Sequence, residues 1–267
     1  MSRLFDAVVK SRAESAEQRD ASTEVLTAET PSEPHGPVKL TRHIEVSDTA
    51  LKRNRVVAFD KNEPEAEAFA ILRTKLLHQM RLNNWNSIGI TAPHEGAGKS
   101  LIAVNLAYSL LLEGNQNILL VDLDLRRPSL HKYFDFTPEL GLVDVVRNGT
   151  DLSDVLVSPQ GSKLTLLPSK ERILHSSETL ALPKMAELMD EMRSRYSDRI
   201  IIFDMPPCLV TDDVMVALPH VDCSLLVAED GKTQEEELEH AYAMLADQGF
   251  MGVVLNKADE SRKLYVY

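Results

Sequence analysis

TAPHEGAGKS, residues 91–100, is the stretch of this sequence that decides the fold. It follows an apolar run and precedes a helical pattern. In that setting Gly96 and Gly98 predict a bend whose backbone N–H groups face an anion at a helix N-terminus. The GKS end is typical of a phosphate loop, in which the lysine reaches the β- and γ-phosphates and the Ser hydroxyl binds magnesium. The stretch therefore predicts a nucleotide site, with Lys99 and Ser100 in these two roles.

Short apolar runs alternate with helical patterns along most of the remaining chain. Such strands, apolar along nearly their whole length, are typical of a parallel sheet that helices cover on both faces. The runs fall at 87–92, 117–122, 163–167, 199–204, 223–228 and 250–255, and crossover helices are expected at 99–113, 178–196 and 233–248. A further amphipathic helix from Glu63 groups Phe69, Leu72, Leu76 and Leu77 on one face. We predict a three-layer α/β fold that binds ligands where the strands end.

Carboxylates follow two of these apolar runs. Asp122 and Asp124 come at the end of ILLVDLDL, and Asp204 ends the later run IIIFD. A single aspartate after a strand is usually a turn or cap residue. Three of them beside a GKS loop instead favour a magnesium–nucleotide site, because the metal and the attacking group both need carboxylates nearby.

Composition limits the classes of partner. The formal net charge of -12 argues against nucleic acid, whose binders neutralise phosphates with clustered Lys and Arg. The two cysteines, Cys208 and Cys223, form no zinc or disulfide pattern, so a reducing cytosol is expected. Because the sequence has neither a run of about 18 to 20 apolar residues nor the apolar core of a signal peptide, we expect a soluble chain.

The chain divides into three expected parts. Residues 1–60 are rich in Ser, Thr, Glu and Pro and are predicted to form a flexible tether with a short helix near residues 3–18. Residues 61–258 carry the alternating pattern and form the predicted nucleotide domain. Residues 259–267 are a polar tail that contains Tyr265 and Tyr267.

Several of these motifs together resemble the bacterial tyrosine kinases of polysaccharide export, of the CpsD/CapB type, including those associated with exosortase loci. The resemblance covers residues 55–260 and includes APHEGAGKS, LLVDLDLRRPSLHKYF, GLVDVV, DRIIIFDMPPCLVTDD and GVVLNKAD. The continuation Arg126-Arg127-Pro128 is its most specific piece. Pro93 replaces the first glycine of the general phosphate-loop pattern, and the resemblance implies that this glycine is dispensable.

The resemblance implies a three-layer P-loop NTPase fold of the MinD/ParA-like branch and a cytoplasmic protein-tyrosine autokinase that uses ATP and Mg²⁺ in exopolysaccharide or capsule synthesis. It makes Lys99, Asp122 and Asp124 catalytic. Asp122 is the expected base and Asp124 the expected partner of the metal, and the two roles are open to exchange. The implied nucleotide-binding residues are Glu95, Gly96, Ala97, Gly98, Lys99, Ser100, Leu101 and Asn256, and the implied metal ligands are Ser100, Asp122 and Asp204.

The chain departs from the family at three places. Tyr265 and Tyr267, the implied phosphoacceptors, replace a longer run of tyrosines. The ring-forming motif Glu-x-x-Arg-x-x-Arg keeps Glu67 and Arg73 but has Ala70 at its middle position. Many relatives carry or bind a two-helix membrane protein that sets polysaccharide chain length, so a separate membrane partner at the inner face of the plasma membrane is implied. Arg126 and Arg127 are expected to bind phosphate oxygens or a neighbouring subunit of a homo-oligomer.

Three alternatives remain open. Partitioning ATPases of the MinD/ParA kind use a lysine five residues before the catalytic lysine, where this chain has His94. The run NKAD, 256–259, resembles the guanine-reading motif of GTPases, but DMPP stands where those enzymes carry Asp-x-x-Gly. A nonenzymatic, nucleotide-dependent regulator of the export machinery would also fit the short tyrosine tail.

Overall fold

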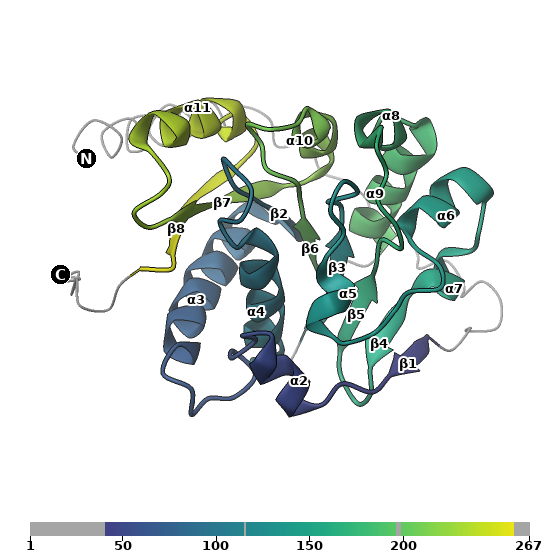
Figure 1. Ribbon diagram of the computed structural model, residues 1–267, viewed down its shortest axis with the longest axis horizontal. Coiled ribbons are helices and arrows are strands. Elements are labelled where there is room, and N and C mark those ends of the chain that lie inside the picture. The colour runs from purple at the N-terminus through teal and green to yellow at the C-terminus, as the bar shows by residue number, and fades with distance from the viewer. Residues whose placement is uncertain (1–40, 115, 196–198, 259–267) are drawn as a thin grey trace, which may run out of the picture. The chain divides into compact units, whose positions relative to one another are not determined.

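A computed structural model describes residues 41–114, 116–195 and 199–258 (Figure 1). The short helix expected near residues 3–18 and the tyrosines at 265 and 267 lie outside these residues. Among the residues described, no helix combines the length and the apolar character needed to span a membrane. Cys208 and Cys223 are both buried and unpaired.

The centre of the described chain is an eight-stranded sheet with the strand order β1-β4-β5-β3-β6-β2-β7-β8. The strands are β1 (Arg42–Ile44), β2 (Ser87–Thr91), β3 (Asn117–Asp122), β4 (Val157–Pro159), β5 (Leu164–Leu167), β6 (Arg199–Asp204), β7 (Cys223–Glu229) and β8 (Phe250–Asn256). The helices are α2 (Asp48–Arg53), α3 (Ala66–Asn83), α4 (Lys99–Leu111), α5 (Leu130–Tyr133), α6 (Leu142–Asn148), α7 (Leu152–Val155), α8 (Ser176–Leu180), α9 (Pro183–Arg195), α10 (Asp213–Ala217) and α11 (Glu235–Leu245), with a 3₁₀ turn η1 (Leu218–His220).

All six predicted apolar runs form strands, and these strands run parallel to one another. The sheet is mixed because β4 pairs antiparallel with β5 and carries β1 beside it. The parallel strands end at one edge of the sheet, so the residues that follow β2, β3 and β6 are brought together there. The predicted α/β fold class is therefore confirmed, apart from the two short reversed strands.

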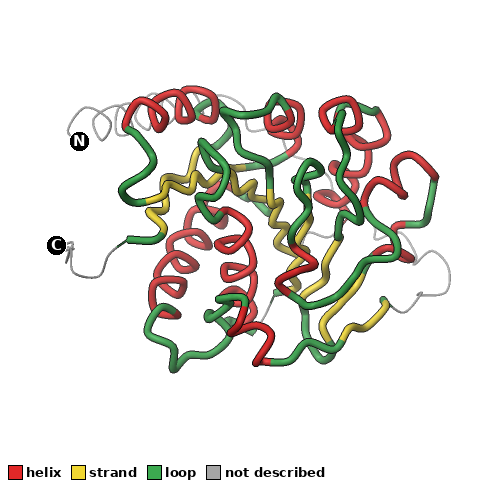
Figure 2. The backbone as a smooth tube through the Cα atoms, viewed as in Figure 1, coloured by secondary structure: helices red, strands yellow, loops and turns green. Residues whose placement is uncertain are grey.

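Helices cover the sheet on both faces (Figures 1 and 2). Along β3, Ile118 and Leu120 pack with residues of α3 and α4, whereas Leu119 and Val121 pack with residues of α6, α9 and α11. Successive side chains of a strand point to opposite faces, so a strand buried on both sides must be apolar throughout. This explains why the apolar runs of the sequence show no alternation with polar residues.

The crossover expected as one helix over residues 178–196 is two helices. α8 ends at Leu180, and α9 begins at Pro183. A proline has no N–H to continue a preceding helix, but it is tolerated in a first turn, where N–H groups lack partners anyway. The first helix therefore ends before Pro183, and a second helix begins at this residue.

Residues 41–60, which fall within the predicted tether, pack on the domain in the structure. Leu51, Val56 and Ala58 are buried in the core beneath α3 and α4, and β1 pairs with β4. The carboxamide of Asn105 accepts the N–H groups of Val57 and Ala58 at 2.8 and 3.0 Å. The segment 41–60 is about as apolar as the whole chain, but the residues that bury it belong to α3 and α4, later in the chain, so its sequence alone did not show that it packs on the domain.

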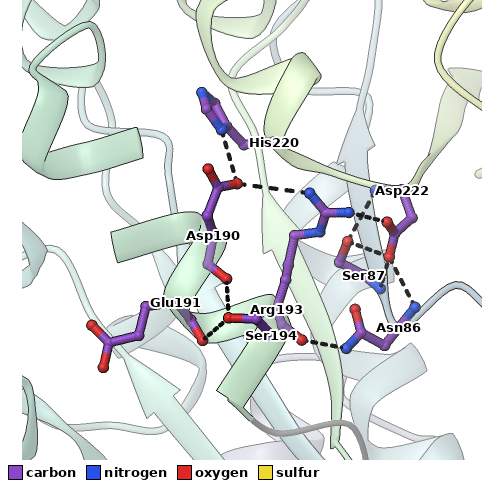
Figure 3. Close-up of polar contacts among 8 residues, drawn as sticks. All are labelled: Asn86, Ser87, Asp190, Glu191, Arg193, Ser194, His220 and Asp222. Atoms are coloured by element: carbon purple, nitrogen blue, oxygen red, sulfur yellow. Dashed lines mark hydrogen bonds and ion pairs between the residues drawn. The ribbon is translucent and has the colours of Figure 1, made fainter. Parts of the chain in front are cut away.

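At the opposite end of the parallel strands, where β2 and β7 begin, the carboxylate of Asp222 holds the two strands together (Figure 3). Its Oδ2 accepts the N–H groups of Asn86 and Ser87 at 2.9 and 3.0 Å and the Ser87 hydroxyl at 2.9 Å. Its Oδ1 accepts from the Arg193 guanidinium of α9. This cluster joins the starts of β2 and β7 to α9, on the side of the sheet away from the phosphate loop.

Candidate functional site: a phosphate loop beside three carboxylates

The loop between β2 and α4 adopts a shape that favours an anion. Gly96 and Gly98 have φ values of 82° and 98°, in the left-handed region that glycine occupies without strain. The N–H groups of Ala97 and Gly98 have no hydrogen-bond partner among the described residues. They lie just before α4, whose N-terminus carries partial positive charge. The loop is thus a set of unsatisfied donors of the kind that binds phosphate.

Lys99 opens α4 and points its ammonium at the carboxylates. Its Nζ donates to Oδ2 of Asp124 at 2.6 Å, and both side chains are largely buried. Asp122 and Asp204 lie opposite each other in the register of β3 and β6, where these neighbouring strands end. The structure therefore brings the predicted lysine and all three predicted aspartates into one site.

Burial dominates the electrostatics of the two deepest carboxylates. It raises the pKa of Asp204 to about 6, against the charge of Lys99 and a contact with the Ser100 hydroxyl that lacks full hydrogen-bond geometry. Burial and the charge of Asp204 raise the pKa of Asp122 well above its ordinary value, although the N–H groups of Leu130 and Ser129 oppose this rise. For Lys99, burial lowers the pKa, but the three carboxylates outweigh it, and the pKa is raised. A cation is therefore favoured here.

Several oxygen atoms in the site lack partners. Three buried oxygen atoms have no hydrogen-bond partner among the described residues: both carboxylate oxygens of Asp204 and Oδ1 of Asp122. Such orphaned acceptors suit a hard cation and its water ligands. The described part of the chain holds no cluster of three or more His, Cys, Asp or Glu side chains able to bind a metal alone. The residues thus fit Mg²⁺, which usually takes many of its ligands from phosphate and water.

A cavity of about 190 Å³ opens beside the loop. Ligand pockets usually measure roughly 300 to 1,000 Å³, so this one has room for a phosphate chain and not for a whole nucleotide. Its wall includes Asp124 but neither Asp122 nor Asp204. The lining residues are Glu95, Gly96, Lys99, Asp124, Arg126, Arg127, Ser129, Pro206, Pro207 and Thr211.

Asn256 was expected among the nucleotide-binding residues. In the structure its Nδ2 donates to the carbonyl oxygen of Ala97 at 2.8 Å, so it contacts the phosphate loop directly. Lys257, which the sequence did not mark, donates from Nζ to the carbonyl oxygen of Gly96 at 2.8 Å. His94 bridges the loop and Thr233, with 2.8 Å between Nε2 and the threonine hydroxyl.

The comparisons with known proteins agree with this geometry. A family model described as an AAA domain matches residues 86–232, which is more than half of the chain. The chain belongs to the AAA domain family. The matched range of this AAA domain runs from the start of β2 to the loop after β7 and so contains the phosphate loop and the three aspartates.

Several relatives of this AAA domain are named as bacterial tyrosine kinases, so the predicted resemblance is confirmed. This chain is 30% identical over 208 residues to the putative tyrosine-protein kinase EpsB of Ralstonia solanacearum. The alignment covers 77% of this chain and 27% of EpsB. The chain is 28% identical over 206 residues to the putative tyrosine-protein kinase CapB of Staphylococcus aureus, covering 76% of this chain and 89% of CapB. The kinase domain of the Escherichia coli tyrosine kinase ETK superposes with a TM-score of 0.71 at 26% identity, over 85% of this chain and 91% of that domain.

The residues proposed for oligomer contacts fall into two places of the AAA domain. Arg126 donates from Nε to the Ser176 hydroxyl at 2.9 Å and pairs with the buried Asp213. Arg127 pairs with Glu95 at 2.5 Å, beside the cavity. Both arginines thus belong to the rim of the site. The other two lie on α3, where Glu67 is exposed and Arg73 donates to the carbonyl oxygen of Ser109 on α4 at 2.8 Å.

Sequence reasoning missed two residues near the site, Ser129 and Lys257. Ser129 donates its N–H to Asp122 at 3.0 Å and its hydroxyl to Ser100 at 3.1 Å, which fixes both side chains. It follows directly on the Arg-Arg-Pro motif, which was the available signal. Lys257 stands inside the NKAD run, in which only Asn256 was assigned a role.

Proposed function

We propose that this chain is an ATP-dependent protein-tyrosine autokinase that acts in exopolysaccharide or capsule synthesis or export. The observation that carries the proposal is the convergence of Lys99, the unsatisfied N–H groups of the loop and three buried carboxylates on one edge of the sheet. Phosphoryl transfer needs positioned donors and cations around the γ-phosphoryl group and needs no covalent enzyme intermediate. The names of the relatives support tyrosine as acceptor.

In the proposed reaction a tyrosine oxygen forms a bond to the γ-phosphorus while the bond from that phosphorus to the β-phosphate oxygen breaks. ADP leaves, and the phenolic proton passes to a carboxylate. Lys99 would leave Asp124 and neutralise the phosphate oxygens, while the N–H groups of Ala97 and Gly98 bind them. Bound magnesium, held by Ser100 and a carboxylate, would supply further neutralisation of charge.

The position of the cavity favours Asp124 as the base and Asp122 on the metal side, which exchanges the two expected roles. Asp124 lines the cavity that an acceptor could enter. Asp122 is fully buried and accepts the N–H groups of Ser129 and Leu130 at 3.0 Å each. Because Ser129 also bonds to Ser100, Asp122 is tied to the expected metal ligand and not to the open side of the site.

We further propose Tyr265 and Tyr267 as acceptors and a separate membrane protein that sets polysaccharide chain length as partner. This would place the chain at the inner face of the plasma membrane. The acceptor tyrosines follow β8 by about ten residues, and ten extended residues span roughly 35 Å. That reach permits transfer to a neighbouring copy in a homo-oligomer.

The partitioning-ATPase alternative is less well supported. The lysine that reaches across the dimer in those ATPases would stand at position 94. His94 instead contacts Thr233 and the carbonyl oxygen of Glu95 within the same chain. A GTPase is disfavoured because DMPP, residues 204–207, stands where those enzymes carry Asp-x-x-Gly. A nonenzymatic regulator would still bind nucleotide and differs only in phosphorylating nothing.

The test is to incubate the purified chain with Mg-ATP and map phosphorylated residues by mass spectrometry. We expect phosphate on Tyr265 or Tyr267, and its loss in Lys99→Ala and in the double variant Tyr265→Phe/Tyr267→Phe. Lys184→Ala is the matched lysine control, since Lys184 is exposed and contacts Glu187 at 3.7 Å. Nucleotide binding without phosphotyrosine, even with a membrane partner of the chain-length class added, would favour the nonenzymatic regulator.

A further inference from the structure

Three successive carbonyl groups of the phosphate loop accept hydrogen bonds from side chains. His94 Nδ1 lies 3.0 Å from the carbonyl oxygen of Glu95, Lys257 Nζ lies 2.8 Å from that of Gly96, and Asn256 Nδ2 lies 2.8 Å from that of Ala97. We call His94, Asn256 and Lys257 the carbonyl clamp. The next carbonyl, that of Gly98, accepts the N–H of Ile102 inside α4 at 3.0 Å.

The carbonyl clamp sets the direction of the N–H groups that follow. A trans peptide is planar, so the carbonyl of one residue and the N–H of the next point in opposite directions. With the carbonyls of Gly96 and Ala97 held by Lys257 and Asn256, the N–H groups of Ala97 and Gly98 must point away from β8. These two N–H groups have no partner among the described residues.

The clamp side chains are themselves held in place. The N–H of Lys257 donates to Asn256 Oδ1 at 2.9 Å, which leaves the Nδ2 of Asn256 to face the carbonyl of Ala97. Lys257 Nζ also pairs with Glu229 at 3.0 Å. A Cβ on Gly98 would lie 2.1 Å from Asn256 Nδ2, so the clamp fits closely only against glycine. The end of β8 therefore acts as a rigid support for the loop.

We propose that Asn256 and Lys257 are positioning residues that aim the loop N–H groups at the phosphate chain, with His94 as a weaker third member. They would set the affinity for di- and triphosphates without contacting them or the base. The cause is geometric: a loop whose carbonyls are released can turn them toward the anion and repel it. This inference rests on the proposed nucleotide site and concerns residues that lie about 160 positions from the loop.

The experiment measures binding of Mg-ADP and of adenosine to the full chain by calorimetry. For Lys257→Met we expect Mg-ADP affinity to fall about tenfold, as for loss of a charge-assisted hydrogen bond, with adenosine affinity unchanged. Lys257→Arg should restore most of the Mg-ADP affinity. Lys184→Met is the matched control, because it removes the charge of an exposed lysine, which pairs with Glu187 at 3.7 Å, without releasing a loop carbonyl, and should change binding less than twofold.

Asn256→Ala separates the clamp from a role in holding the base. The clamp predicts weaker Mg-ADP binding with unchanged adenosine binding, whereas equal losses for both ligands would overturn the inference for Asn256. Thermal melting of each variant would show that it is folded. If the wild-type chain binds Mg-ADP and Lys257→Met binds it equally well, the clamp is wrong and the nucleotide site stands. If the wild-type chain binds no Mg-ADP, the proposed function itself fails.

Discussion

The carboxylate of Asp204 shows how a site can be built at the expense of stability. Its side chain is fully buried, and neither oxygen has a hydrogen-bond partner among the described residues. A buried, unpaired carboxylate costs free energy unless it is protonated or meets a cation. Its pKa of about 6 expresses this cost. The residue is therefore better suited to a metal-loaded state than to the ligand-free fold.

Asp204→Asn should stabilise the ligand-free chain above pH 6. A pKa raised from 3.8 to about 6 means that the folded state holds a proton that the unfolded state releases, so stability falls as the pH rises through this window. At pH 7.5 the wild type carries the full cost, and the variant should gain up to about 3 kcal/mol in free energy of unfolding. Below about pH 4 the gain should vanish. Urea unfolding at both pH values measures it.

Asp212→Asn is the matched control for this experiment. Asp212 pairs with Arg126 at 3.6 Å, at the rim of the cavity. Its side chain is 71% exposed, so neutralising it should change stability little at either pH. Asp204→Asn should also weaken magnesium-dependent nucleotide binding, since stability and function oppose each other at this position. A loss of stability at pH 7.5 in Asp204→Asn would contradict the account of Asp204.

At the level of single residues, the sequence singled out side chains that the structure brings together. Lys99, Asp122, Asp124 and Asp204 were found because each follows a recognisable apolar run or loop motif. The base and metal roles of the two neighbouring aspartates could not be separated, because residues two apart along the chain differ in burial only after folding. Asn256 was expected to bind nucleotide. Its contact with the carbonyl of Ala97 could not be predicted, because Ala97 lies far away in the sequence.

At the level of elements, the loop and the end of β8 work as a unit. Gly98→Ala tests this unit, because a Cβ there would have both an unfavourable φ of 98° and a contact of 2.1 Å with Asn256. Gly114 is the matched control, since its φ is 81° and nothing lies within 4 Å of an added Cβ. Both variants should lose about 1 kcal/mol from backbone strain. Gly98→Ala should lose at least about 1 kcal/mol more.

Chemical denaturation of the two variants measures this difference, and Mg-ADP binding should fall only in Gly98→Ala. Equal destabilisation and equal binding in the two variants would show that Asn256 yields easily and that the loop does not depend on it. The element-level prediction from sequence was sound where long apolar runs marked strands. It missed β1 and β4, each only three residues long, because such short strands carry too little pattern to be read.

At the level of the whole molecule, the start of the domain differs from the one that composition indicates. Ser, Thr, Glu and Pro mark the tether, and this polar composition fades gradually into a segment that packs on the core. Burial of Leu51 and Val56 and the bonds of Asn105 depend on α3 and α4, which come later in the chain. A segment of this kind is stable only through contacts with distant residues, so its own sequence does not reveal it.

Two truncations would locate the start of the domain. The described residues from 41 onward belong to one compact unit, so a chain of residues 41–267 should melt within about 2 °C of the full chain. A chain of residues 61–267 should lose about 4 kcal/mol or more, because it removes the buried Leu51 and Val56 and leaves the Asn105 amide without its partners. Calorimetric melting of the two chains at equal concentration would decide between the boundaries. Equal melting temperatures would mean that residues 41–60 add nothing to stability and that the boundary near residue 60 holds.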